Sequence, residues 1–104
     1  MTKVWIKVQA IMQGSQEELL VAMCDSNLLG KKITAGKVEF VISKNFYGGE
    51  LVDIEKMLKV LKMATIANIV GEECINAALS AGLIDESSIK KIKNVPHAQI
   101  FSAQ

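Results

Sequence analysis

The sequence predicts a single α+β domain: a mostly antiparallel sheet of three to five strands with two main helices packed on one face. Three observations favour this two-layer fold. Stretches with strand-like alternation come first, up to residue 42; two helical patterns follow between residues 53 and 82; and another strand-like stretch comes last. Strands followed by helices, in the order β-β-β-α-α-β, are typical of α+β domains rather than of strictly alternating α/β domains.

The length and composition indicate one globular domain over residues 1–104. A chain of this size buries roughly 60–70% of its unfolded surface, which is enough for one hydrophobic core. The sequence is 50% hydrophobic and 22% charged, so it resembles globular rather than disordered proteins. Its net charge of +1 creates no overall field that would attract nucleic acid or a membrane.

Three strands are predicted in the first part of the chain. TKVWIKVQAIM alternates between apolar and polar residues, and ELLVAMC is apolar on both faces, so the second stretch should be a central strand. The two should form a hairpin whose loop, QGSQE, has about five residues. DSNLLGKKITAGK is expected to be a loop with at most a short strand, and KVEFVIS alternates again. The residues expected to point inward are Val4, Ile6, Val8, Ala10, Val38, Phe40 and Ile42.

Two helices are predicted in the second part. Asp53 is a candidate N-cap, and apolar residues follow it with the helical spacing 54, 57, 58 and 61. ATIANIVG is ambiguous between an extension of this helix and a short helix of its own. GEECINAALSAGL is predicted to be the second helix, because Glu72 and Glu73 lie near its positive end and Gly82 fits the left-handed position after its last turn.

The end of the chain is predicted to return to the sheet. Asp85 begins a turn or a single helical turn, and IKKIKNVPHAQIF then supplies one or two late strands. Pro96 has no N–H to donate to a ladder, so it is expected at the start of a strand or on an edge.

The basic residues and the cysteines exclude several kinds of site. All twelve basic residues are Lys, so bidentate binding of phosphate, carboxylate or guanine by Arg is excluded. Cys24 and Cys74 are fifty residues apart and His97 is the only histidine, so neither a metal site nor a cofactor is predicted. No signal peptide or run of about 20 apolar residues is apparent, and two free thiols favour a cytoplasmic location.

Several short stretches together resemble one protein family. MCDSNLLGKK, FYGGELV, ATIANIVGEE and VPHAQI are similar, in this order, to an archaeal family of small conserved proteins known as domain of unknown function 424. The resemblance implies a compact cytoplasmic domain without an assigned activity, in the company of the translation apparatus. The residues that match the family pattern are Cys24, Asp25, Gly30, Phe46, Tyr47, Gly48, Gly49, Glu50, Asn68, Gly71, Glu72, Pro96, His97 and Gln99. The resemblance implies no catalytic residue among them.

The stretch SKNFYGGELVD is a candidate ligand loop. Gly48 and Gly49 would let a phosphate or a base approach the backbone, and Tyr47 could stack on a base. Glu50, however, puts a negative charge where an anion would bind, and the spacing fits neither GxxxxGK[ST] nor GxGxxG. The alternative is a turn that needs positive φ at one or both glycines, with Phe46 anchored in the core.

Cys24 and His97 are the only candidates for catalysis. A histidine beside a thiol could lower its pKa and make it a nucleophile. The alternative is a buried, inert thiol and a polar surface histidine, with Asp25 bonding to backbone N–H groups in a turn.

The lysines suggest the function that we expect first. Lys31 and Lys32 follow a glycine, and Lys90, Lys91 and Lys93 precede the last strand, so a shared face would form a phosphate-binding patch. We therefore predict a non-catalytic module that binds RNA or a ribonucleoprotein through these lysines together with Tyr47, His97 and Gln99. One alternative is an enzyme or small-ligand protein with a pocket between FYGGE and VPHAQ. Another is a homo-oligomer or protein-interaction module that uses an exposed strand edge.

Overall fold

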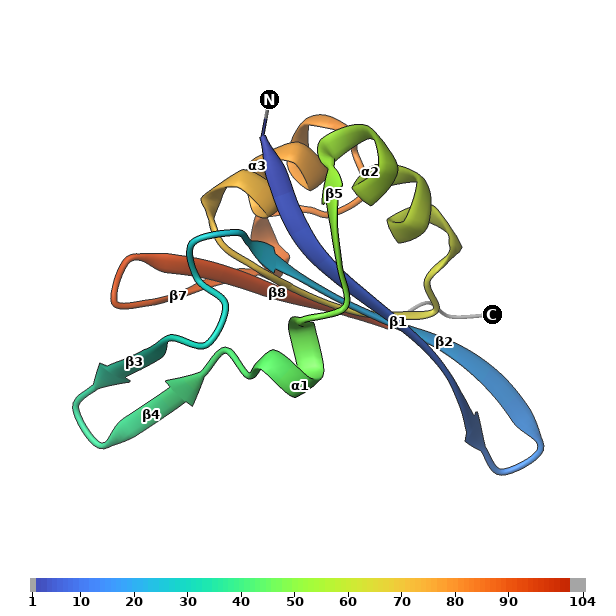
Figure 1. Cartoon of the computed structure of the whole chain (residues 1–104), viewed down its shortest axis with the longest axis horizontal. Coiled ribbons are helices and arrows are strands. Elements are labelled where there is room, and N and C mark those ends of the chain that lie inside the picture. Colours follow the sequence, from blue (N-terminus) through green and yellow to red (C-terminus); the bar gives the residue numbers. More distant parts are fainter. Residues whose placement is uncertain (1, 102–104) are drawn as a thin grey trace.

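The computed structural model describes residues 2–101, and Figure 1 shows their arrangement around one long twisted sheet. The strands are β1 (Lys3–Gln13), β2 (Gln16–Asp25), β3 (Lys32–Ala35), β4 (Val38–Val41), β5 (Glu50–Asp53), β6 (Ile66–Val70), β7 (Ile89–Ile92) and β8 (Val95–Phe101). The helices are α1 (Lys44–Tyr47), α2 (Ile54–Met63) and α3 (Glu72–Ser80), and Glu86–Ser88 forms a 3-10 turn.

The main sheet is mixed. Its six strands lie in the order β5-β1-β2-β6-β8-β7, while β3 and β4 form a separate two-stranded sheet. β2 and β6 are parallel, and the other neighbouring pairs of the main sheet are antiparallel. The parallel pair therefore joins an N-terminal half, β5-β1-β2, to a C-terminal half, β6-β8-β7.

The predicted fold class is wrong. About half of the described residues lie in strands, the sheet is larger than three to five strands, and the order β-β-β-α-α-β does not hold. The three helices have only 4, 10 and 9 residues, so the fold is dominated by the sheet and does not contain the expected pair of main helices. The largest error is in ATIANIVG, which forms the central strand β6 instead of a helix. A short strand buried between two others lacks the alternation that would distinguish it from a buried helical segment.

The residues of the sheet alternate between two hydrophobic clusters. Val21 and Met23 of β2 belong to the larger cluster, which also contains Met57 of α2 and Ile75 of α3. The intervening residue Ala22 belongs to a second cluster, on the opposite face. The second cluster is the smaller one, and its other buried members are Cys24, Ile42, Tyr47 and Val70. The helices α2 and α3 therefore cover one face, and the β3–β4 hairpin and α1 lie against the other (Figure 1).

A buried carboxylate connects the carboxyl end of β2 to the start of α3. Asp25 is 7% exposed, and its two oxygens accept hydrogen bonds from the backbone N–H groups of Glu73 and Cys74, each at 3.0 Å. The N-terminus of a helix carries free N–H groups and a partial positive charge, and the carboxylate satisfies both. Gly71 precedes the helix with φ of 108°, and a Cβ there would lie 2.2 Å from Cγ of Asp25. This close approach requires a glycine.

The local predictions for the two longer helices are confirmed. The Asp53 side chain accepts from the backbone N–H of Lys56 at 2.9 Å, as an N-cap should. At the end of α3, Gly82 has φ of 72°, and the N–H of Leu83 donates to the carbonyl of Ala78 at 3.0 Å. This bond is characteristic of the Schellman motif, in which a glycine takes the left-handed position after the helix. Within residues 2–101, no helix has the length and hydrophobicity needed to cross a membrane.

The strand predictions in the first half need correction in two places. The β1–β2 hairpin has a two-residue turn rather than a five-residue loop, since Gln13 pairs with Gln16. The hairpin therefore extends beyond the core, and Val8 is 46% exposed although it was expected to be inside. β4 pairs with β3 alone and leaves Val38 58% exposed, while Ile42 just after it is fully buried.

We expect Gly71→Ala to destabilise the protein by about 2–4 kcal/mol, because the new Cβ would meet strained backbone and displace the Asp25 cap. Gly14→Ala is the control: Gly14 also has positive φ, 64°, but nothing lies within 4 Å of its Cβ position. It should cost only about 1–2 kcal/mol, the cost of the left-handed backbone. Urea unfolding followed by circular dichroism measures both values, and equal losses would contradict the role of the Asp25 contact.

Candidate functional site

Polar side chains gather on the face of the sheet opposite α2 and α3. Asn68 of β6 pairs with Gln99 of β8, and His97 pairs with Lys90 of β7, so these four side chains share one face. Phe101 follows on the same face of β8 and is 69% exposed. We call this surface the open face; it consists of Asn68, Lys90, His97, Gln99 and Phe101.

An amide pair occupies the middle of the open face. Nε2 of Gln99 donates to Oδ1 of Asn68 at 2.8 Å. The bond fixes the orientation of both amides, so the Gln99 carbonyl and the Asn68 amino group remain to bond with a ligand. The two residues are thirty-one positions apart in the chain, so this pair could not be read from the sequence around either residue.

His97 is held against an aromatic ring. Its imidazole lies 5.6 Å from the ring of Phe40, measured between centroids, with the planes tilted by 43°. Partial burial, and then the positive charge of Lys90, lowers the pKa of His97 below its usual 6.5. At neutral pH the ring is therefore uncharged, with one nitrogen as donor and the other as acceptor.

The segments FYGGE and VPHAQ meet at a small cavity beside the open face. The cavity has a volume of about 60 Å³. A larger hollow of about 290 Å³ lies next to it, on the β7 side. The cavity is lined by Phe40, Tyr47, Asn68, Ile69, Val70, His97, Ala98 and Gln99, and the hollow by Ser87, Ser88, Lys90, His97, Gln99 and Phe101. Only the hollow is large enough for part of a ligand.

Tyr47 cannot stack on a ligand in this structure. It is 5% exposed and belongs to the second hydrophobic cluster, with its ring edge-on to Phe46 at a centroid distance of 5.0 Å. Burial, and then the neighbouring Cys24, raises its pKa to about 12. The aromatic residue that is exposed on this face is Phe101, which the late-strand alternation His97, Gln99, Phe101 could have indicated.

The glycines of the candidate ligand loop are explained by close packing. Ser43 caps the short helix α1, with its Oγ accepting from the N–H groups of Asn45 and Phe46 at 3.1 and 3.3 Å. Neither Gly48 nor Gly49 has the positive φ that was expected. A Cβ at Gly49 would instead lie 2.4 Å from the carbonyl oxygen of Ile6, and one at Gly48 would lie 2.5 Å from that of Lys44. Glu50 begins β5 and is exposed.

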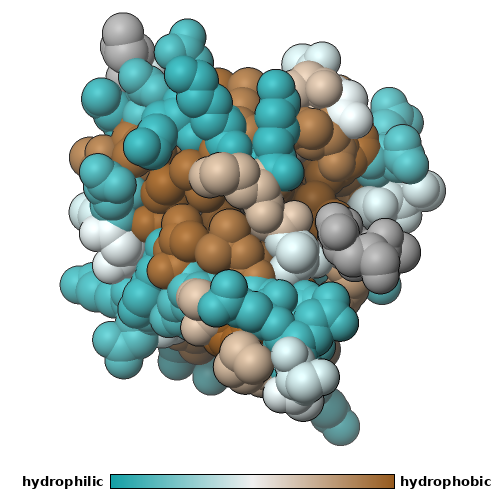
Figure 2. Space-filling model, turned by 90° about the vertical axis from the view of Figure 1, so that its right-hand side faces the viewer, coloured by the Kyte–Doolittle hydropathy of each residue, from teal (hydrophilic) through white to brown (hydrophobic). Residues whose placement is uncertain are grey.

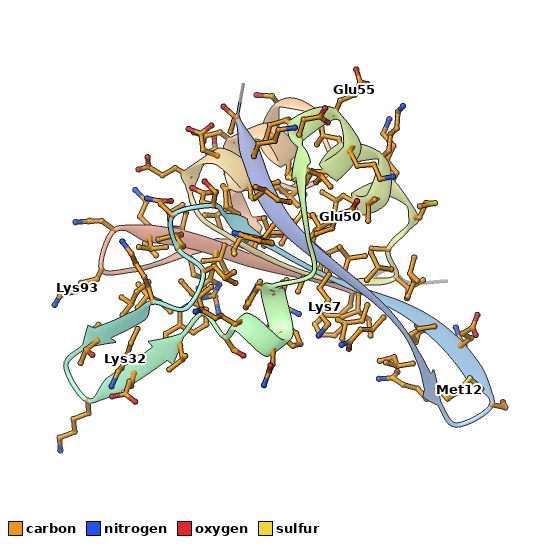
Figure 3. The ribbon with its side chains drawn as sticks, in the orientation of Figure 1. Lys7, Met12, Lys32, Glu50, Glu55 and Lys93 are labelled. Carbon is orange, nitrogen blue, oxygen red and sulfur yellow. The ribbon has the colours of Figure 1, made fainter. Side chains whose placement is uncertain are left out.

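Four of the five lysines that were predicted to bind phosphate lie at one end of the molecule. Lys93 lies in the turn between β7 and β8, Lys32 lies on β3, and Figure 3 shows both at the same end. β3 contacts β7, which brings Lys90 to this end, and Lys31 directly precedes β3. Lys32 pairs with Glu39 at 3.5 Å. Lys91 departs from the group, because it faces the groove beside α3 on the other side of the sheet.

Cys24 and His97 do not form a catalytic pair. Cys24 pairs with Val70, and Val70 pairs with His97, so a whole strand separates the two residues. Two strand spacings place their backbones about 10 Å apart. Cys24 is fully buried, and burial, followed by the charge of Asp25, raises the pKa of its thiol to about 12. Cys74 is also fully buried, and burial raises its pKa further. Both thiols therefore stay protonated.

Comparisons with known proteins agree with this fold. The sequence profile of the protein family of unknown function DUF424 matches residues 13–102. The chain belongs to the DUF424 family. A similar fold occurs in the crystal structure of an uncharacterized conserved protein from Methanopyrus kandleri, with a TM-score of 0.73 and 24% sequence identity. The match covers 98% of this chain and 95% of that one. A search of curated proteins gives no match.

Eight of the fourteen residues that carried the resemblance form two groups in this DUF424 chain. Asp25, Gly71, Glu72 and Pro96 lie together at the carboxyl end of the parallel strands and line a hollow of about 170 Å³. The role of Asp25 as a helix cap could not be read from the sequence, because Asp25 and its bonding partners are 48 and 49 residues apart. The second group lies around the small cavity on the other face: Tyr47, Asn68, His97 and Gln99.

We expect both thiols to be unreactive in the native protein. A thiol reagent such as Ellman's reagent should label neither Cys24 nor Cys74 until urea unfolds the chain, and should then label two per chain. Val38→Cys is the matched control, since residue 38 is 58% exposed and should add one fast-reacting thiol. Fast native labelling of the wild-type chain would contradict the burial of these residues.

The lowered pKa of His97 predicts a specific dependence of stability on pH. Above pH 6.5 the histidine is neutral in both the folded and the unfolded chain, so its contribution is fully present there. As the pH falls below 6.5, the unfolded state binds the proton first, and the free energy of unfolding decreases until the lower folded pKa is reached.

His97→Gln should remove this part of the pH dependence and leave the remaining acid unfolding unchanged. Chemical denaturation of both proteins between pH 7.5 and 5 measures the difference. Parallel curves for wild type and variant would show that the pKa of His97 is the same in both states.

Proposed function

We propose that the protein is a small non-catalytic module that binds single-stranded RNA on the open face. The supporting observation is the gathering of an exposed phenyl ring, a neutral imidazole, an amide pair and an exposed lysine on one side of the sheet. Sheet surfaces with this mixture suit unpaired bases, which offer a flat face for stacking and polar edges for hydrogen bonds.

Each part of the open face has a distinct role in this proposal. Phe101 and His97 stack on bases, and such contacts contribute about 1–3 kcal/mol per base. The free amide groups of Asn68 and Gln99 bond to a base edge or to the 2′-hydroxyl that distinguishes RNA from DNA. Lys90 and Lys93, with Lys32 from the neighbouring hairpin, bind phosphates at the end of the sheet.

The absence of Arg and the low net charge determine what kind of binding is expected. Lysines act as point charges and do not form the bidentate bonds that read guanine. With a net charge of only +1, attraction depends on the local group of lysines and not on the whole chain. We therefore expect moderate affinity, weak sequence preference and strong dependence on salt. An association with the translation apparatus and a cytoplasmic location remain predictions of the same proposal.

The alternative of a small-ligand pocket is less well supported. The cavity between FYGGE and VPHAQ has about 60 Å³, whereas sites for organic ligands usually have about 300–1,000 Å³. An enzyme would also need a reactive group near this cavity, and Cys24 is a buried thiol with a pKa of about 12. Because the cavity is too small to enclose an organic ligand, a ligand that lies across the sheet is favoured.

We expect a fluorescent single-stranded RNA of about ten nucleotides, within the usual site size, to bind with an affinity that falls steeply with salt. Fluorescence anisotropy measures this. Phe101→Ala should weaken binding about tenfold, the lower part of the range for one lost stacking contact. The double variant Lys90→Ala/Lys93→Ala should reduce the slope of log affinity against log salt by about 1.4, or 0.7 for each lost phosphate contact.

Lys56→Ala/Lys59→Ala is the matched control, because it removes the same charge from exposed positions of α2 on the other side of the sheet. It should change neither the affinity at moderate salt nor the salt slope. Equal effects of the two double variants, or no effect of Phe101→Ala, would contradict binding on the open face.

A further inference from the structure

The outer half of β1 lacks a strand partner on one edge. β5 pairs only with residues Lys3–Ile6 of β1, and β2 covers the other edge along its whole length. Gly49, directly before β5, lies against the backbone of Lys7. Among the described residues, no strand pairs with the free edge from Val8 to Gln13. Such an edge presents a row of backbone N–H and C=O groups that can pair with another chain.

The same region is only two strands wide. β6 begins its pairing with β2 at Leu20, and Thr65 bonds to the backbone N–H and C=O groups of Leu19. Among the described residues, positions 16–18 of β2 therefore also have a free outer edge. We call residues 8–13 and 16–18 the arm; Figure 1 shows it projecting from the body of the molecule. Two-stranded ribbons are marginally stable in water without further packing. A strand partner would therefore stabilise the arm.

The free edge lacks the features that normally prevent strand pairing. From Val8 to Gln13 the sequence is VQAIMQ, without charge, proline or glycine. Val8 is 46% and Met12 63% exposed, and Figure 3 shows Met12 near the tip of the arm. Lys7 is drawn aside, since its Nζ donates to the carbonyl of Asn45 in α1. Figure 2, viewed from the side of the arm, shows a hydrophobic patch between hydrophilic borders.

We propose that the arm is the contact between two copies of this chain. In the proposed dimer, β1 of each copy pairs antiparallel with β1 of the other across a two-fold axis perpendicular to the sheet. The two six-stranded sheets then form one continuous sheet, and the ribbon becomes four strands wide at its centre. This inference concerns an edge remote from the open face and does not depend on RNA binding.

The geometry of the edge specifies one register. Pairing the five residues from Val8 to Met12 with the same residues of the second copy puts Ala10 on the two-fold axis, opposite the second copy's Ala10. Val8 then lies opposite the second copy's Met12, and Gln9 lies opposite its Ile11. Paired residues must point to the same face of a sheet, and all these pairs satisfy that condition because each joins two even or two odd positions. The exposed residues Val8 and Met12 thereby cover each other.

A second copy fits this edge better than a different chain does. The edge carries no charge between Val8 and Gln13 that would select an acidic or basic partner. Its hydrophobic positions match those of the same strand reversed, which is the self-complementarity that a two-fold contact requires. The contact is also closed, since each copy uses its free β1 edge in pairing with the other, so this edge forms a dimer and not a fibre.

Sedimentation velocity over a range of concentrations tests the proposal. We expect the wild-type chain to reach twice its mass of 11.3 kDa as the concentration rises. Ala10→Lys and Ala10→Glu each place like charges opposite one another at the axis and should weaken the dimer about 100-fold. A mixture of the two variants places opposite charges there and should restore a 1:1 dimer. Residue 10 is exposed, so circular dichroism should show both variants folded.

Val38→Lys is the matched control, because it adds the same charge to an exposed hydrophobic position of β4, outside the arm. It should leave the dimer intact. A wild-type chain that stays monomeric would overturn the proposal and make the arm a docking strand for another protein. A dimer that persists in both Ala10 variants would also overturn it, because the contact would then use another surface. Failure of the mixture to pair would exclude the proposed register.

Discussion

The pairing of β2 with β6 holds the two halves of this protein together, and Asp25 stabilises the point where that pairing ends. β2 belongs to the N-terminal half of the sheet and β6 to the C-terminal half, and theirs is the parallel contact. A parallel pair requires a long connection, and here that connection contains β3, β4, α1, β5 and α2. At the carboxyl end of the pair, the Asp25 carboxylate accepts hydrogen bonds from free N–H groups of α3. The carboxylate fits there because Gly71 has no side chain. One carboxylate thus links a strand, a neighbouring strand and a helix.

The same topology explains why the two faces of the sheet differ. The connection after β6 immediately forms α3, which packs on the face that already holds α2. The other face receives only a short helix and a two-stranded hairpin, and these cover the region around Cys24 and Tyr47. The strands β6 and β8 extend past this cover, so the side chains that they point to this side there remain at least partly accessible. Apart from Ile66, these side chains are polar or aromatic.

The two proposals would act together if both hold. A two-fold axis perpendicular to the sheet leaves the open faces of both copies on the same side of the continuous sheet. One RNA strand could then contact both, and linking two weak sites raises the overall affinity when the strand can span them. Dimerisation would in this way compensate for the low net charge and the absence of arginine. Because the arm and the open face lie on different parts of the sheet, variants of one leave the other intact.

Some residues of the candidate site could be predicted from the sequence, and others could not. His97 and Gln99 of VPHAQ were predicted as candidates because they match the family pattern, and the lysines before them because they cluster in the sequence. Tyr47 was predicted to be a contact residue but is buried, since α1 turns its ring toward Cys24 and Val70. Whether an aromatic ring faces solvent depends on what packs over the strand, and local sequence carries little information about that.

The sequence by itself determined the elements whose signals are local. Asp53 and Gly82 mark helix ends through bonds to residues a few positions away, and the alternation in β1 and the late strands follows from the geometry of a single strand. Only the tertiary structure decided the rest: that ATIANIVG is a central strand, that Asp25 caps a distant helix, and that the FYGGE glycines allow close packing. Each of these depends on contacts between residues far apart in the chain, and such contacts leave no periodic pattern in the segment itself.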